Sequence, residues 1–238
     1  LIFLIFSFSI FYKNDFVNYF TYIIEKKSEK YGLTLKNVSV NKTKNLSKEY
    51  IEKYFQNHFN KSIFFLPLKA IQNKILENNW IQNLDLEIIY PSTVKVIILE
   101  KNPIGIYHTN NDYFLIDDKA QIIEKINNIK HRKLIVVYGI GSLNQLPKLI
   151  NNLNYFKNLN VTSAQYVGSR RWDLFIEKKL KVKLPENNYL KALEDLCSVI
   201  NELEEFDYNL IESVDLRIKE KAIIRFYNND NINLLDSL

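Results

Sequence analysis

The first thirty residues form an apolar stretch followed by a helical pattern. Residues 1–12 carry no charge, and the first charged residue is Lys13. At about 1.5 Å per residue they span roughly 18 Å, short of the ~30 Å core of a bilayer. They fit either a signal-peptide core without its small-residue cleavage site, or the outer half of a transmembrane helix. We favour the helix, because no cleavage site follows, and we expect its remainder upstream, because the chain does not begin with methionine.

The apolar spacing continues as a helix up to about residue 31. Apolar residues recur at helical intervals from Phe16 to Ile24, and Tyr19 and Tyr22 suit a membrane interface. Gly32 is placed to end the helix. Residues 1–31 are therefore expected to be a partial transmembrane helix with a juxtamembrane extension.

Residues 32–102 predict a small domain with the order strand, helix, helix, strand, strand. A strand covers 33–40, and Ser47 is a candidate N-cap for a helix over 48–59. Pro67 suits the start of a second helix. Apolar and polar residues then alternate over 84–88 and 94–98, as in two half-buried strands. Two helices would pack on one face of a three-stranded sheet and leave the other face accessible.

Residues 103–227 predict a larger, β-rich domain that begins at Pro103. Its helices are expected over 144–158 and 188–205, and its strands over 104–108, 113–116, 121–124, 134–137, 161–167, 172–176, 181–184, 211–216 and 222–227. Residues 228–238 are polar and are expected to be a flexible tail. The whole chain is thus α+β: a truncated membrane helix, a small domain and a mixed β domain with two helices.

Charge and cysteine content exclude several classes of protein. The net charge is +5, with 32 Lys and Arg spread among 27 Asp and Glu, which is typical of a solvated surface. Nucleic-acid binding is not expected, because such proteins concentrate their basic residues. The single cysteine, Cys197, cannot form an internal disulfide, and its place in an apolar helical stripe predicts a buried thiol.

No set of residues has the spacing of a catalytic or metal site. His58, His108 and His131 fall in separate predicted elements. Residues 139–142 read Gly-Ile-Gly-Ser, which matches neither a phosphate-binding loop nor a nucleophile elbow. Asp117 and Asp118 suit a turn better than an acid–base pair. We therefore expect no enzyme, no catalytic residue, no cofactor, no metal and no small-molecule substrate.

Two features could bind a protein partner. Arg170-Arg171-Trp172 could anchor an acidic partner, because guanidinium groups bind carboxylates in a planar, bidentate way; it could equally form local salt bridges. The apolar run at 222–227 could be an edge strand to which a partner strand adds. Helices or the tail could cover this edge instead.

A collinear series of motifs runs from the small domain to the end of the second: Val38-Ser39-Val40, Trp80-Ile81, Tyr90-Pro91, Glu100–Pro103, Tyr113–Asp117, Ser169–Leu174, Leu184–Glu186 and Val214–Arg217. This series resembles the bacterial cell-division family FtsQ/DivIB. There are three departures: Asn41 and Ala120 each replace a frequent glycine, and Lys101 replaces an arginine. The resemblance implies that the small domain is a POTRA domain.

The resemblance implies a scaffold of the divisome in the inner membrane. It implies a single-pass protein with its bulk in the periplasm at the septum, which binds FtsB and FtsL and so connects to the septal peptidoglycan synthase. The POTRA part is implied in recruitment. Carried over by position, the resemblance singles out Arg171, Arg217 and the run Ile223–Tyr227 as partner-binding. Together with the Arg-Arg-Trp run considered above, the predicted partner-binding residues are Arg170, Arg171, Trp172, Arg217, Ile223, Ile224, Arg225, Phe226 and Tyr227. The alternative is a POTRA-bearing component of an outer-membrane assembly or secretion system.

Overall fold

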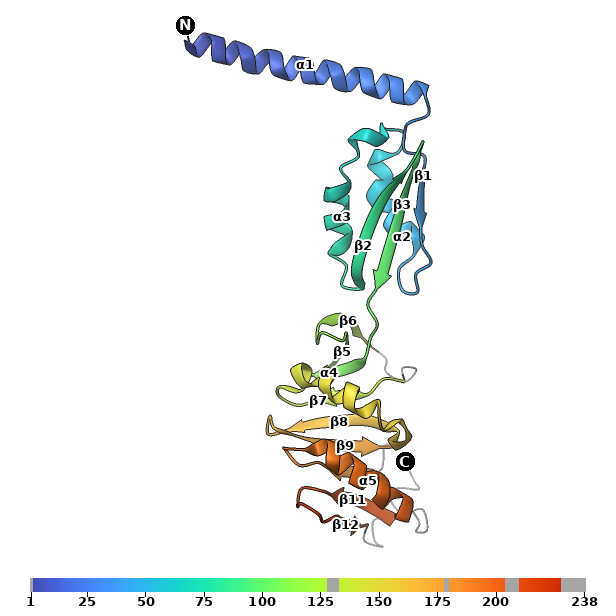
Figure 1. The fold of residues 1–238 in the computed structure, drawn as a ribbon, viewed down its shortest axis with the longest axis vertical. Helices are drawn as coiled ribbons and strands as arrows, with labels where there is room; N and C mark the ends of the chain where they lie inside the picture. Colours follow the sequence, from blue (N-terminus) through green and yellow to red (C-terminus); the bar gives the residue numbers. More distant parts are fainter. Residues whose placement is uncertain (1, 128–132, 178–179, 204–209, 228–238) are drawn as a thin grey trace. The chain divides into compact units, whose positions relative to one another are not determined.

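In a computed structural model, the chain divides into two compact units, Leu1–Lys101 and Asn102–Leu238. The structure describes residues 2–127, 133–177, 180–203 and 210–227. His131, one of the three histidines for which no site is expected, lies outside these residues. So does the tail expected at 228–238. Figure 1 shows the order of the elements along the chain.

The helix expected at the start of the chain is present as α1, Ile2–Lys30. Gly32 ends it as predicted: its φ is +71°, a left-handed conformation that glycine adopts without steric cost. The Leu33 amide then donates to the Ser28 carbonyl at 2.7 Å, which satisfies the last turn. Among the helices whose side chains the structure describes, none is long and apolar enough to cross a membrane.

The rest of the first unit is a three-stranded sheet with helices on one face, as predicted. Its elements are β1 (Asn37–Val40), α2 (Lys48–Glu52), the 3-10 helices η1 (Lys53–His58) and η2 (Ile63–Phe65), α3 (Leu68–Leu76), β2 (Ile81–Ile89) and β3 (Thr93–Glu100). The sheet order is β1-β3-β2; β1 runs parallel to β3, and β2 antiparallel to it. The helix expected over 48–59 ends early, because its later turns tighten into 3-10 geometry.

Two side chains bond the loop after β1 to the backbone or to residues of β3. The side-chain amide of Asn41 bonds both backbone groups of Ile98: its nitrogen donates to the Ile98 carbonyl at 2.9 Å, and its oxygen accepts from the Ile98 amide at 2.7 Å. The Glu100 carboxylate accepts backbone N–H groups of residues 44–46 at 2.7–3.0 Å. Both residues therefore fix the loop after β1 onto β3.

The second unit is built on a nine-stranded sheet with the order β12-β11-β10-β9-β8-β7-β4-β5-β6. All nine strands expected from the alternating pattern are present, and the two helices are α4 and α5. The bounds are β4 (Gly105–Thr109), β5 (Asp112–Ile116), β6 (Ile122–Ile126), β7 (Val136–Tyr138), α4 (Ser142–Leu153), β8 (Val161–Val167), β9 (Arg171–Ile176), β10 (Leu180–Lys183), α5 (Tyr189–Leu203), β11 (Ile211–Asp215) and β12 (Ile223–Phe226).

One face of this sheet packs against the helices and forms the core. Trp172, Leu174 and Val182 from the strands pack with Leu146 of α4 and Leu193 of α5, and all five are buried. Because side chains alternate along a strand, the residues between these core positions lie on the opposite face. That opposite face therefore carries Arg171, Asp173, Phe175, Lys181 and Lys183.

Candidate partner-binding face

The last strand of the chain lies at one end of the sheet. β12 pairs antiparallel with β11, which is its one neighbour among the strands that the structure describes. Ile223 is 50% exposed and Phe226 is 52% exposed, whereas Ile224 packs partly against the core. An edge strand with exposed apolar side chains is a place where a second strand can add.

The backbone of β12 alternates between β11 and the outside. The Tyr227 amide donates to the Leu210 carbonyl at 2.8 Å, so it points toward β11. Since the period of a strand is two residues, the N–H groups of Ile223 and Arg225 point the same way. Those of Ile224 and Phe226 then point away from β11, toward a strand that would add at this edge.

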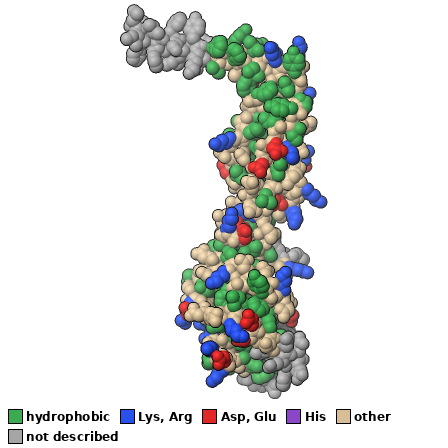
Figure 2. Space-filling model, in the orientation of Figure 1, with side chains coloured by type: hydrophobic (Ala, Val, Ile, Leu, Met, Phe, Trp, Pro, Cys, Tyr) green, Lys and Arg blue, Asp and Glu red, His purple; other side chains and the backbone are tan. Residues whose placement is uncertain are grey.

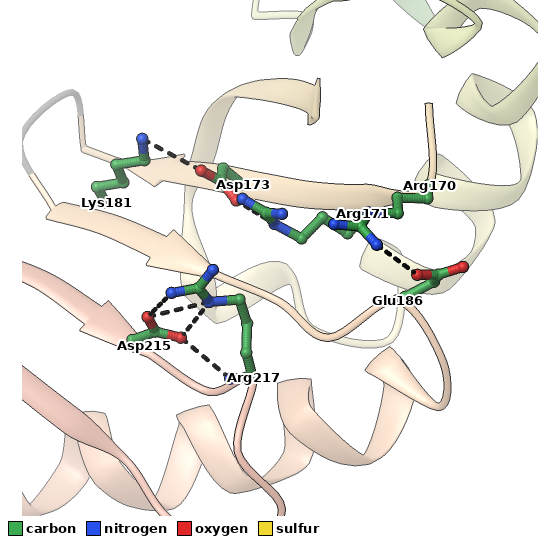
Figure 3. Close-up of polar contacts among 7 residues, drawn as sticks. All are labelled: Arg170, Arg171, Asp173, Lys181, Glu186, Asp215 and Arg217. Carbon is green, nitrogen blue, oxygen red and sulfur yellow. Dashed lines mark hydrogen bonds and ion pairs between the residues drawn. The ribbon is translucent and has the colours of Figure 1, made fainter. Parts of the chain in front are cut away.

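A charged cluster lies on the face opposite the helices, a few strands from this edge (Figure 3). Asp173 of β9 has a side chain that is only 3% exposed, and its carboxylate lies 3.1 Å from the Lys181 Nζ and 3.6 Å from the Arg171 Nε. The second distance is an ion pair and is too long for a hydrogen bond. Burial, followed by the charge of Asp173, raises the pKa of the Tyr138 hydroxyl.

The loosely held arginine is the part of this cluster that can bind a ligand. The Arg171 Nε and the Asp173 Oδ1 are buried and have no hydrogen-bond partner in the described structure. A buried polar atom without a partner costs free energy. The Arg171 side chain is 19% exposed, so an acidic side chain of a partner could reach only the exposed part of its guanidinium.

Arg217 follows β11 and is held by a carboxylate of its own. Its Nε donates to the two oxygens of Asp215 at 2.8 and 3.0 Å, and its amide donates to the same carboxylate at 3.1 Å. The hydrogen bond from Arg217 is the main reason why the pKa of Asp215 is lowered. The Arg217 side chain is still 43% exposed, so a bound partner can reach it.

Arg171, Asp173, Lys181, Asp215 and Arg217 are called the arginine face from here on. Lys183 of β10 lies between Asp173 and Asp215 in the strand register. Counting Lys183, this face has four cations against two carboxylates, so it is positive overall. Arg225 of β12 extends it to the edge strand, 4.0 Å from the Glu212 carboxylate. A partner with acidic side chains is favoured here.

Two residues of the predicted site lie elsewhere. Trp172 is 3% exposed and packs on the Tyr166 ring in the core, with ring centroids 4.7 Å apart. Alternation turns this side chain inward when Arg171 points outward, and a role for Trp172 in binding a partner stays a prediction. Arg170 is exposed at the end of the β8–β9 turn, and its guanidinium lies 3.6 Å from the Glu186 carboxylate. It forms the local salt bridge that the sequence left open.

The other candidates for chemistry have structural explanations. Asp117 accepts the amides of Lys119 and Gln121 at 3.0 and 2.8 Å, as expected of a turn residue. Ala120 takes the left-handed conformation of that turn, with φ at +62°. Cys197 is half-buried against the core rather than fully buried. Within the described residues no group of three His, Cys, Asp or Glu side chains could hold a metal.

Sequence reasoning missed the carboxylates that hold the arginines. Asp173 and Asp215 each stand two residues from an arginine, at Arg171 and Arg217. Residues two apart in a strand share a face, so this spacing could have paired Asp173 with Arg171 in β9. Lys181 could not be found in this way, because it comes from a neighbouring strand.

Comparison of the sequence with models of protein families gives a match for each of the two units. A family model for the FtsQ-type POTRA domain matches residues 33–101, and one for the C-terminal part of the cell division protein FtsQ/DivIB matches residues 105–217. The chain is thus a POTRA-bearing protein whose POTRA unit precedes an FtsQ-type β unit. These two models do not describe an outer-membrane assembly component.

Curated relatives give the family directly. The chain is 33% identical to cell division protein FtsQ of Rickettsia bellii over 199 residues, covering 82% of this chain and 73% of that protein. It is also 33% identical to FtsQ of Rickettsia felis, covering 88% and 78%. The extracytoplasmic domain of DivIB from Geobacillus stearothermophilus, a solved structure, covers 46% of this chain and 98% of its own at 10% identity, with a TM-score of 0.34 that adds no support.

The chain belongs to the FtsQ/DivIB family of cell division proteins. This family consists of scaffold proteins of cell division and is not a known enzyme family.

Proposed function

We propose that this protein is a membrane-anchored scaffold of the divisome that binds FtsB and FtsL through its second unit. Residues 1–31 would anchor it in the inner membrane, with the POTRA unit (32–102) and the β unit (103–227) in the periplasm at the septum. The bound partners would connect septum assembly to peptidoglycan synthesis. The POTRA unit would serve in recruitment.

The observation that carries the proposal is the position of β12. It is one of the two edge strands of its sheet among the described residues, with the outward N–H groups of Ile224 and Phe226 at the edge. A partner segment would add there as a further strand. Acidic side chains of that segment would bind Arg225 at the edge and Arg171 and Arg217 on the arginine face.

Calorimetric titration with the periplasmic C-terminal segment of FtsB from the same organism tests the proposal. Ile224→Pro removes an N–H that points away from β11, so β12 itself stays paired. We expect it to weaken binding by roughly tenfold, because one backbone hydrogen bond of about 0.5–1.5 kcal/mol is lost and the proline ring obstructs its neighbours. Ile224→Ala is the matched control, since it shortens the same side chain and keeps the N–H.

Charge reversal tests the arginine face separately. Arg217→Glu should weaken the binding of FtsB, because it places a carboxylate where the partner's acidic group would lie. Lys148→Glu makes the same change of charge on an exposed position of α4, on the helix-covered side, and should leave the affinity unchanged. Wild-type affinity in both Ile224→Pro and Arg217→Glu would refute the site assignment.

A further inference from the structure

Four large apolar side chains are exposed at the end of the first unit where α1 stops. Phe64 is 51% exposed, Phe65 44%, Ile89 47% and Tyr90 59%. The rings of Phe64 and Tyr90 lie 6.0 Å apart, so η2 and the β2–β3 turn contribute to one surface. These four residues are called the aromatic patch. Figure 2 shows hydrophobic side chains, in green, at this end of the unit.

Hydrogen bonds fix the aromatic patch to the last turn of α1. The Ser28 and Ser62 hydroxyls are bonded at 2.8 Å, and these residues are only 2% and 1% exposed. The Ile63 amide donates to the Leu33 carbonyl at 3.0 Å, directly before Phe64. A buried polar contact of this kind is costly to break. The direction of α1 and the position of the aromatic patch are therefore coupled.

Exposed aromatic residues are followed by lysines toward the end of α1 that adjoins the aromatic patch. Large apolar residues on the described part of the helix have no packing partner in the core and are exposed: Phe16, Val17, Tyr19, Phe20 and Tyr22. Lysines follow at the end of the helix and beside the aromatic patch: Lys26, Lys27, Lys30, Lys36 and Lys61. Aromatic rings next to lysines are typical of the boundary between lipid tails and headgroups.

We propose that the aromatic patch lies in the membrane–water interface and holds the POTRA unit against the bilayer. The inference rests on the membrane anchoring proposed above, since α1 would bring the aromatic patch to the lipid surface. The occupant is a phospholipid bilayer with anionic headgroups, because lysines lie close to the aromatic patch along the backbone: Lys30 ends α1, Lys61 directly precedes Ser62, and the Lys36 amide donates to the Ser92 carbonyl two residues after Tyr90. Interfacial apolar surfaces enter the boundary by roughly 5–10 Å, which suits rings that are half exposed.

Quenching by brominated lipids tests this in the full-length protein. The protein is reconstituted into vesicles of phosphatidylglycerol and phosphatidylcholine with bromine on the acyl chains. Tyr90→Trp places a reporter in the aromatic patch, and Leu99→Trp places one on β3 near its other end, where Leu99 is 55% exposed. The emission of unsubstituted protein, from Trp80 and Trp172, is subtracted.

We expect Trp at position 90 to lose about half of its emission, as for a ring at interfacial depth, and Trp at 99 to lose none. If Trp at 90 and Trp at 99 lose the same fraction of their emission, in protein that floats with the vesicles, the inference is overturned and the anchoring is left intact. Protein that does not float with the vesicles overturns the anchoring, and this inference with it.

Discussion

Replacing Asp173 by Asn should destabilise the second unit by far more than the loss of an ordinary surface ion pair. The Asp173 carboxylate is 3% exposed and lies 3.1 Å from the Lys181 Nζ. At an effective dielectric constant of about 20, charges at 3.1 Å attract by roughly 5 kcal/mol before desolvation is subtracted. The variant removes this attraction and leaves Lys181 and Arg171 without their shared counter-charge.

The expected loss follows from the burial of each group. Breaking a buried ion pair by removing one partner costs about 3–5 kcal/mol. The side chains of Lys181 and Arg171 are 34% and 19% exposed, so water screens part of the charge. We therefore expect the free energy of unfolding of the second unit to fall by about 2–3 kcal/mol.

Urea unfolding followed by tryptophan emission measures this loss. In a Trp80→Phe background the remaining Trp172 lies in the core beside Asp173 and reports the second unit alone. The matched control is Asp195→Asn, which removes an exposed partner of Lys191 at 3.0 Å on α5 and should lower the free energy of unfolding far less, because water screens this pair. Equal losses in the two variants would refute the reasoning.

Three further expectations concern single side chains. Trp172→Ala should lower the stability of the second unit by about 3–5 kcal/mol in thermal unfolding, because the side chain is core rather than interface. Arg217→Ala should raise the pKa of Asp215 toward its ordinary 3.8 in a carboxyl NMR titration. Because that pKa is depressed in the wild type, the pair stabilises the fold above about pH 4 and the contribution is lost as pH falls further; an unchanged pKa would contradict this. Ser47→Ala should cost the first unit about 1 kcal/mol in urea unfolding, since its hydroxyl caps α2 at the Tyr50 amide, and Ser47→Asp should restore it.

The sequence identified many residues of the candidate site, but not which face of the sheet each side chain occupies. The run at 222–227 is apolar and close to β-rich segments, and the structure gives it as β12 at the end of the sheet. Arg170 and Arg171 were found for their chemistry and Arg217 through the resemblance, whereas Trp172 was included as the aromatic residue beside the first two. Neighbours in a strand point to opposite faces, so Arg171 and Trp172 could not share a surface.

The sequence by itself determined the order and type of the elements in both units. Alternation with a period of two and apolar spacing with a helical period are local properties, and they predicted the nine strands and two α-helices found in the described part of the second unit. The caps at Ser47 and Gly32 are equally local, because each depends on bonds within one turn.

Only the tertiary structure decided which strand forms the edge and which charges meet. β10 and β11 pair in parallel although α5 separates them in the chain, and β4 pairs in parallel with β7. Such pairings join distant residues, and their free energy depends on packing that no local pattern records. The same long-range pairing places Lys181 beside Asp173 and leaves β12 with one neighbour among the described strands.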